Sequence, residues 1–554
     1  MSAAIDVPFL VVGAGPVGLT TARLLADGGH GCLVVERRDG PQRHPAAHVV
    51  NARTLEIFRQ AGLDMAAIDS VAKDPADAGH VNFVTRLDGR LIGRLPFERQ
   101  GEECLALTPT PLRNISQHRL EPILAAEVSA TPGVELRYGS EWRSAEVDGS
   151  GVTSVVVDAS TGEQIVVRSR YLIAADGAGS RIRKWLGIDM VGPASLQSFV
   201  AIHLRADLRP VVAERPGVLH FVMDPAASGV FVAHDPASEW VFMVDYDPAT
   251  ESVDDFDAAR CAALVDAAIG QAQVPFEVLG VGTWHMTAQV AERMRSDRVF
   301  LVGDAAHRFP PTGGLGLNTG VADAHDLAWK LCAVEEGWAG PALLDSYESE
   351  RRPVAEINCE QSTSNAIRIL DLVVALGLDD DPSTERLHAA LDDPDAVGAI
   401  AEAVDAQATH FDMLGLQLGH VYAGGAIARE GERPPSLTDP RSFDPHAEVG
   451  ARLPHAWTTD GRSTLDMVDR HGLTLLTFGS HDAWADRIAA ETAPVVQVVV
   501  GPDLVDGSWR ERCGIGPDGA LLVRPDQHVA WRSEACDGDR LDALAGAVAL
   551  TVGC

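Results

Sequence analysis

The sequence has few basic residues for its length. Its 554 residues include 45 Lys and Arg against 79 Asp and Glu, so the net charge at pH 7 is −34. A field of this sign repels phosphate backbones, and we therefore expect no nucleic-acid partner. Apolar residues still make up 46% of the chain and charged residues 22%, which is typical of a globular protein with packed cores rather than of a disordered one.

Cysteines and long apolar runs are also scarce. The eight cysteines include no Cys-X-X-Cys pair and no His/Cys cluster with the spacing of zinc ligands, so we expect free thiols in a reducing cytoplasm and no metal site. The apolar segment at residues 7–22 is interrupted by prolines and glycines and is too short to span a bilayer. No targeting segment is visible, and the prediction is a cytoplasmic protein without a membrane contact.

The length predicts two large domains and a small third one. Near the start, an apolar strand at residues 9–12 leads into a Gly-X-Gly-X-X-Gly turn and a helical pattern, and a second strand at 32–35 ends at an acid. In such a βαβ unit the glycines admit a pyrophosphate and the acid accepts hydrogen bonds from a ribose, which leaves FAD and NAD both open. The predicted cofactor contacts are Gly13, Gly15, Gly18, Glu36 and Arg37.

The stretch at residues 303–320 favours FAD. Asp304 follows the apolar strand that begins at Val299, and a run of glycines then opens a helix at 317–334. Reduced flavin carries negative charge on its ring, so backbone amides and a helix N-terminus aimed at the ring stabilise it. We predict that Asp304 holds ribityl or ribose hydroxyls and that the helix start contacts the cofactor through Gly314, Gly316, Leu317 and Asn318.

A third motif, Asp176-Gly-Ala-Gly-Ser-Arg181, follows another apolar strand. In this order the three motifs resemble those of the class A flavoprotein monooxygenases, the aromatic hydroxylases of the para-hydroxybenzoate hydroxylase type. The resemblance implies that Asp176 and Arg181 contact FAD and the passing nicotinamide, and that Gln117 contacts the flavin. Residues 344–353 and the C-terminal unit resemble the phenol hydroxylase and chlorophenol monooxygenase branch of this family.

The resemblance also implies a reaction. Enzymes of this family bind FAD, take NADH or NADPH as a transient co-substrate, and form a flavin C4a-hydroperoxide with O2 whose distal oxygen passes to an electron-rich ring. We therefore expect a monooxygenase that hydroxylates a phenolic or polycyclic aromatic substrate. The alternatives are a Baeyer–Villiger or ring-opening oxygenase on the same fold, a flavin-linked reductase that does not activate O2, and a non-catalytic FAD-folded binding protein.

The predicted fold class is α/β. A Rossmann-like FAD domain of the glutathione-reductase type is expected to enclose an antiparallel-sheet substrate domain, and the C-terminal order of strands and helices is that of a thioredoxin-like domain. Because this last domain lacks Cys-X-X-Cys, we expect it to be structural or dimer-supporting, and the protein to be a homodimer. The predicted bounds are 1–185 and 295–370 for the FAD domain, 186–294 with parts of 76–105 and 371–428 for the substrate domain, 429–454 for a linker, and 455–554 for the thioredoxin-like domain.

A phenol is a better target for oxygen transfer once it is deprotonated. Holding a phenolate of pKa near 10 at pH 7 costs about 4 kcal/mol, so the site needs a proton acceptor or positive potential. In the phenol hydroxylase branch an acid stands five residues before the Arg-Thr pair that opens the next helix. Here that pair is Arg53-Thr54, and His48 takes the position. We predict His48 as the base, with an imidazole pKa near the ordinary 6.5, and Pro311 and Tyr246 as further catalytic residues.

One position departs from the family pattern. Family members commonly carry Pro-Arg-Ala after the Glu-Arg-Arg stretch, but here Ala46 stands in place of that arginine, and Arg43 is the residue that could replace it. Two other histidines of the predicted substrate domain, His203 and His285, could contact a phenol, although a structural role is the commoner one for such residues. His307 is expected to hold its loop.

Overall fold

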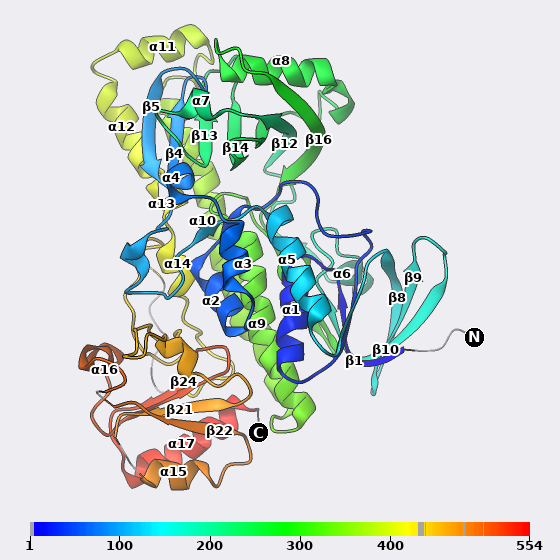
Figure 1. Cartoon of the computed structure of the whole chain (residues 1–554), viewed down its shortest axis with the longest axis vertical. Coiled ribbons are helices and arrows are strands. Elements are labelled where there is room, and N and C mark those ends of the chain that lie inside the picture. Colours follow the sequence, from blue (N-terminus) through cyan, green and yellow to red (C-terminus); the bar gives the residue numbers. More distant parts are fainter. Residues whose placement is uncertain are drawn as a thin grey trace.

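The computed structural model describes residues 5–553, except for 430, 432–436, 438, 480–481 and 502. Part of the predicted linker and Cys554 therefore lie outside the described residues. The described chain is a mixed α/β structure with three large sheets, which occupy the middle, the top and the bottom of Figure 1. No helix in the described ranges is both long and apolar enough to cross a membrane.

The middle sheet contains the two strands of the N-terminal βαβ unit at its centre. Five of its strands are parallel neighbours in the order β19-β10-β1-β2-β7, while β8, β9 and β18 add antiparallel pairs at its margins. Helix α1 connects β1 to β2 and packs against α5 and the long helix α9. The bounds are β1 (Ile5–Val12), β2 (Cys32–Val35), β7 (Val134–Arg137), β8 (Ser140–Asp148), β9 (Gly151–Asp158), β10 (Gln164–Ala174), β18 (Arg295–Ser296), β19 (Val299–Leu301), α1 (Pro16–Asp27), α5 (Gln117–Ala130) and α9 (Leu315–Glu336).

The alternating segments between residues 197 and 286 join two strands from residues 80–96 in a seven-stranded sheet, in the order β16-β12-β15-β14-β13-β4-β5. Its pairs are antiparallel except for β13 with β4, which run parallel. This exception to the predicted antiparallel sheet arises because β4 joins from a distant part of the chain, where no hairpin dictates its direction. The bounds are β4 (His80–Val84), β5 (Leu91–Pro96), β12 (Gln197–Ala206), β13 (Leu219–Val222), β14 (Gly229–Asp235), β15 (Glu239–Asp245) and β16 (Phe276–Met286).

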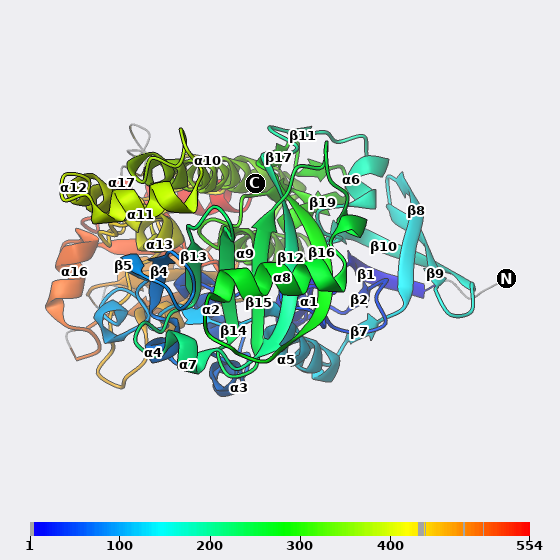
Figure 2. The ribbon, with the colours of Figure 1, turned by 90° about the horizontal axis from the view of Figure 1, so that it is seen from above.

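The two faces of this sheet differ because successive side chains of a strand point to opposite sides. On one face, residues such as Ile202, Phe231 and Phe242 pack under helix α8 (Ala258–Ile269), which lies across the strands in Figure 2. The other face carries apolar residues that belong to none of the packed clusters of the described chain, and five of them are close neighbours on β12, β15 and β14. We call this the sheet patch: Ala201, Val230, Val232, Val241 and Met243.

The C-terminal residues form a separate four-stranded sheet in the order β22-β21-β23-β24, at the bottom of Figure 1. Its elements appear in the order that the sequence predicts, with one addition, the short helix α16. Seven of the eight cysteines lie in the described residues and are free. The bounds are β21 (Leu473–Thr477), α15 (Asp482–Ile488), β22 (Val495–Val499), α16 (Gly507–Cys513), β23 (Ala520–Val523), β24 (Val529–Ser533) and α17 (Gly538–Thr551).

Candidate functional site

The first glycine turn closes tightly between β1 and α1. A Cβ on Gly13 would lie 2.1 Å from the carbonyl oxygen of Ala175, and one on Gly18 would lie 2.0 Å from that of Gly13, so neither position tolerates a side chain. Gly15 instead has no heavy atom within 4 Å of its ideal Cβ. The N-terminus of α1 therefore opens onto free space at Gly15, where a pyrophosphate can approach its amides.

The acid at the end of β2 is held as an anion. Glu36 is 7% exposed and accepts hydrogen bonds from the backbone N–H of Ala14 and of Arg38, each at 2.9 Å. Although burial opposes it, these bonds and the Arg38 guanidinium lower the pKa of Glu36. The predicted contact Arg37 is exposed. Sequence reasoning missed Arg38, which also bridges to Glu121 at 2.9 Å.

The loop after β19 faces the start of α9. The exposed Asp304 follows this strand, and its Oδ1 is the only described heavy atom within 4 Å of the ideal Cβ of Gly316, at 3.9 Å. Gly314 has φ of +63° and lies so close to Val49 that a Cβ would come within 2.6 Å of the valine side chain. The structure thus brings Asp304, Gly316 and the segment of His48 together around open space.

The side chain of Asn318 points away from that space. It accepts from the N–H of Asn51 at 2.9 Å and from Thr54 Oγ1 at 2.7 Å, and it donates to the carbonyl oxygens of Val49 and Gly314. Rather than presenting its amide to a cofactor, Asn318 ties the first turn of α9 to the segment that carries His48.

The third motif is linked to the loop of Asp304. Asp176 accepts from the N–H groups of Arg181 and Ile182, while its Oδ1 is buried without a partner. Arg183, 3% exposed, donates to the carbonyl oxygen of Ala305 at 3.0 Å. The exposed Arg181 side chain pairs with Glu141. The unpartnered oxygen and the contact to the Asp304 loop fit a bound cofactor along this edge.

The segment that departs from the family pattern lies beside the start of α5. Gln117 is half-buried, donates its side-chain N–H to Glu121 at 3.2 Å, and donates its backbone N–H to the carbonyl oxygen of Ala47 at 2.7 Å. Arg43, the possible replacement for the missing arginine, is exposed and pairs with Asp39 at 3.0 Å. No contact among the described residues brings Arg43 to the glycine turn at the start of α1 or to the glycines at the start of α9.

His48 is fixed in one tautomer. Gln100 donates to backbone carbonyl oxygens and accepts from Asn114 Nδ2 at 3.1 Å, so Asn114 turns its Oδ1 toward His48 Nδ1, 3.2 Å away. Nδ1 must therefore donate, and Nε2 is left as a hydrogen-bond acceptor. Burial and the charge of Lys73 lower the pKa of His48 to about 3. His48 is thus neutral at pH 7, and the prediction of an ordinary imidazole pKa is wrong because the surroundings disfavour the imidazolium.

The other catalytic candidates are scattered. Tyr246 packs against Phe256 in the cluster under α8, on the face of the sheet opposite to the sheet patch, so the structure does not bring it to His48. Pro311 is exposed in the turn before α9, where its carbonyl oxygen accepts from Gly314 N–H at 3.0 Å. His285 is exposed and bonded to Ser198. His307 is buried and bonded to Asp323 of α9 at 2.7 Å, as expected of a loop brace.

His48 belongs to a cluster of polar side chains of which the sequence singled out only His48 and His203. The cluster joins the first turn of α5 to the ends of β12, β14 and β15. The rings of His48 and His234 make a T-shaped contact with their centroids 5.9 Å apart. The carboxylate of Glu239 accepts hydrogen bonds from His118 and His203, each at 3.1 Å. We call this the histidine–glutamate cluster; its members are His48, Lys73, His118, His203, His234 and Glu239.

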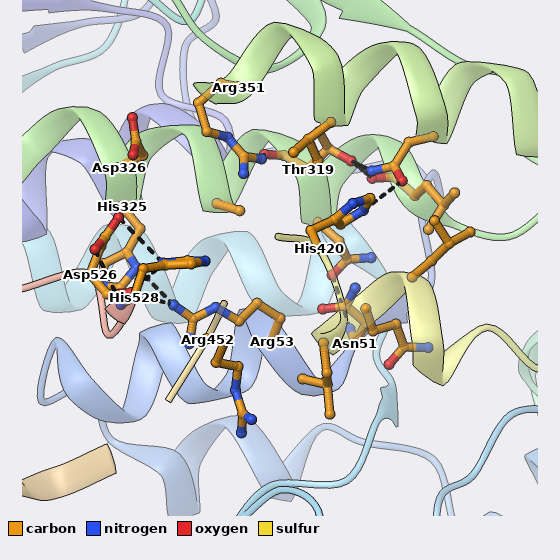
Figure 3. Close-up of a pocket in the computed structure, with 18 of the residues that line it drawn as sticks. Asn51, Arg53, Thr319, His325, Asp326, Arg351, His420, Arg452, Asp526 and His528 are labelled. Carbon is orange, nitrogen blue, oxygen red and sulfur yellow. Dashed lines mark hydrogen bonds and ion pairs between the residues drawn. The ribbon is translucent and has the colours of Figure 1, made fainter. Parts of the chain in front are cut away.

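A polar pocket is lined by residues from the first turns of α9 and by residues of the C-terminal region (Figure 3). Of the predicted cofactor residues, only Asn318 lines it. Arg53, Arg351 and His420 border it together with Asp526 and His528 of the C-terminal region. The volume that the centres of water molecules can occupy in this pocket is about 50 Å³. A single bound water needs about 10–15 Å³ on this measure, so the pocket has room for several waters.

Comparison with known proteins adds the family. A model described as an FAD binding domain matches residues 6–362, and one described as the C-terminal part of aromatic-ring hydroxylases matches residues 446–553. The chain belongs to the FAD-dependent aromatic-ring hydroxylases. These matches, with the relatives described next, confirm the predicted family and the enzyme class, a flavoprotein monooxygenase.

The relatives of this hydroxylase include enzymes named for tetracenomycins and enzymes named for chlorinated phenols. Tetracenomycin B2 monooxygenase-dioxygenase of Streptomyces olivaceus is 36% identical, over 98% of this chain and 98% of its own. The 2,4-dichlorophenol 6-monooxygenase of Delftia acidovorans is 32% identical, over 97% of each. The crystal structure of the flavin-dependent monooxygenase PieE in complex with FAD and substrate superposes with a TM-score of 0.92 at 35% identity, covering 99% of each chain.

Proposed function

We propose that this hydroxylase uses FAD, NADH or NADPH, and O2 to hydroxylate a phenolic ring of a polycyclic aromatic substrate. The observation that carries the proposal is the contact between Val49 and Gly314. Because Val49 follows His48 in the chain, this contact supports a role for His48 Nε2 beside a cofactor bound at the start of α9. The sheet patch and the histidine–glutamate cluster lie on the adjacent sheet face.

The cofactor-binding fold is proposed to be Rossmann-like and of the glutathione-reductase type. The parallel order of β1, β2 and β10 and the open amides at Gly15 support it. Glu36 would hold the adenosine ribose, and Asp304 would hold ribityl hydroxyls opposite Gly316. Residues 1–185 and 295–370 form this proposed domain. The amides before α9 would stabilise negative charge on the ring.

Bound FAD would supply the redox centre at which O2 is activated. The residues of the chain orient and deprotonate the other reactant. The sheet patch receives the flat apolar body of the substrate, and His48 Nε2 accepts a hydrogen bond from the phenolic O–H. Its low pKa means that the proton does not stay on His48, so the charge must be accommodated by other groups of the site.

The dimensions of the sheet favour a substrate of several fused rings. Ala201, Met243 and Val230 are direct cross-strand neighbours, as are His203, Val241 and Val232. With about 4.8 Å between strands and about 3.4 Å per residue, the patch extends roughly 10 Å across three strands and about 7 Å along them. Because histidines border one end, the substrate's phenolic ring would lie there. Residues 186–294, with parts of 76–105 and 371–428, form this proposed substrate domain.

The remaining residues are proposed to support the site. Beyond a linker at 429–454, residues 455–554 form a thioredoxin-like domain without redox activity, which the mixed pairing of β21 with β22 and β23 supports. A homodimer is supported by three exposed apolar residues on one face of helix α10 (Ser346–Ala375): Ile367, Leu370 and Val374, each more than half exposed. The free thiols agree with a cytoplasmic protein.

The test is a comparison of substrates with the purified FAD-loaded protein. Hydroxylated naphthalenes and anthraquinones should accelerate NADH or NADPH oxidation and give products one oxygen atom heavier, whereas single-ring phenols should do so weakly. Matched probes without the hydroxyl group serve as controls. Reductant oxidation that no phenol accelerates, or a protein that takes up no FAD, would refute the proposal.

A further inference from the structure

Within the histidine–glutamate cluster, the carboxylate of Glu239 accepts hydrogen bonds from two imidazoles. His118 Nε2 and His203 Nε2 each lie 3.1 Å from one of its oxygens. Although burial opposes it, these bonds hold the pKa of Glu239 well below its ordinary value. Since an ionised carboxylate can only accept, each histidine must donate through Nε2.

The opposite ring nitrogens are left without partners. His118 Nδ1 and His203 Nδ1 are both buried, and neither has a hydrogen-bond partner among the described residues. With Nε2 carrying the proton, each Nδ1 is an acceptor that is enclosed and unsatisfied, which is costly unless it receives a proton or a donor. A carboxylate behind an imidazole also stabilises the imidazolium that forms when the other nitrogen is protonated.

One further imidazole, that of His234, lies near both His48 and His118. His234 lies between them, 5.9 Å from His48 and 6.3 Å from His118 by ring centroids, and its Nδ1 is bonded to Ser116 at 2.5 Å. Lys73 Nζ is buried without a partner, and its charge helps to lower the pKa of both His48 and His234. The two inner imidazoles are therefore poor places for a proton to remain.

We propose that His118, with Glu239 behind it, is the group that finally accepts the proton of the phenol, and that His234 passes it on from His48. This inference rests on the proposed hydroxylation. The O–H bond of the substrate breaks, its electron pair stays on the phenolate oxygen, and the proton ends on His118 Nδ1. Glu239 is then the positioning residue. Arg119, Asp235 and His203 are the other charged or titratable groups that face the pair.

The test uses the oxidised FAD-loaded protein without reductant, so that no turnover occurs. The probe is a hydroxyanthraquinone whose colour changes on deprotonation, and its apparent pKa in the bound state is read from absorbance between about pH 5 and 10. His118→Gln and Glu239→Gln should raise that apparent pKa by about one unit or more, because each removes part of the acceptor pair. Glu239→Asp should restore part of the shift. His285→Gln, an exposed histidine of the same sheet, should leave it unchanged.

An apparent pKa equal to that of the unaltered protein in both variants would overturn the inference while the hydroxylation itself could still be observed. A holoprotein that shows no perturbed flavin spectrum with the probe, or no hydroxylated product with any phenol, would instead count against the proposed function. If the variants lose FAD, the inference is tested instead by measuring how many protons the unaltered protein releases when the probe binds. Binding of the probe at pH 7 should release much less than one proton per bound phenolate, and release of a full proton would contradict the inference.

Discussion

Two groups of buried charges in this protein are built in opposite ways. The histidine–glutamate cluster contains unpartnered nitrogens on Lys73, His118 and His203. Between α9, α10 and the C-terminal region lies a second group, the buried charge cluster, in which no buried side-chain nitrogen or oxygen lacks a partner. Its members are Asp326, Lys330, Glu350, Arg524 and Asp526, all at most 1% exposed.

Every charged group of the second cluster has an ion-pair partner within the cluster. Arg524 binds Asp326, Glu350 and Asp526 at 2.5–2.9 Å, and Lys330 binds Asp326 and Glu350 at 2.7–2.8 Å. Burial raises the pKa of Asp326 well above its ordinary value, while Lys330 and Arg524 oppose that shift. The satisfied cluster joins α9 and α10 to the C-terminal region, whereas the unpartnered nitrogens of the other cluster support the proposal that it receives the proton of a reactant.

The largest effect should come from breaking the satisfied cluster. Arg524→Met leaves carboxylates buried without their cation and should lower the free energy of unfolding by about 3–5 kcal/mol, measured by urea denaturation. Arg462→Met removes an arginine of the same region whose ion pair with Asp460 is exposed, and should cost under about 1 kcal/mol. Equal losses for the two variants would show that the buried charge cluster stabilises the fold no more than an exposed ion pair does.

A smaller effect on stability and a large one on chemistry should follow from His48→Ala. The variant should keep FAD and still oxidise NADH or NADPH, but hydroxylated product per reductant should fall about tenfold or more, because the phenol loses its acceptor. Since the pKa of His48 is about 3, this loss should not titrate between pH 5 and 8. Exposed His388→Ala is the control. Unchanged coupling in the His48 variant would remove the residue from the mechanism.

The buried, unpartnered Lys73 should make the free energy of unfolding depend on pH. Burial lowers the pKa of Lys73 from 10.5 to about 7, so between about pH 7 and 10.5 the unfolded chain binds more protons than the folded one, and this residue makes stability rise with pH. Lys73→Met should therefore gain most relative to the unaltered protein at pH 6 and progressively less toward pH 10, as measured by urea denaturation. Lys184→Met, at an exposed lysine, should show no such trend. A gain independent of pH would contradict the assignment.

The smallest effect is expected for the thiols of the C-terminal region. Burial raises the pKa of Cys513 to about 12, which keeps its thiol protonated and unreactive. Combining Cys513→Ala with Cys536→Ser should leave product formation unchanged at equal FAD content. A loss of turnover in this double variant, restored by an external thiol, would show that the region has a redox role.

The sequence alone determined the parts of the protein that depend on local backbone geometry. Gly13 and Gly18 stand where no Cβ fits, Gly15 and Gly316 border open space, and Glu36 and Asp304 follow strands. These requirements act within a few residues and therefore appear as motifs. The confirmed family and enzyme class rest on them.

Only the tertiary structure decided which side chains face the reactant. Tyr246 follows β15 on the α8 side because a strand alternates its faces, and no local signal says which face is covered. Asn318 turns to the segment of His48 rather than to the cradle. The histidine–glutamate cluster joins residues from four distant segments, and the pKa values of His48 and Lys73 follow from their burial together. Burial and charge contacts of this kind exist only after the two sheets and α5 have packed, which is why the sequence could suggest His48 and His203 singly but not the cluster that they form.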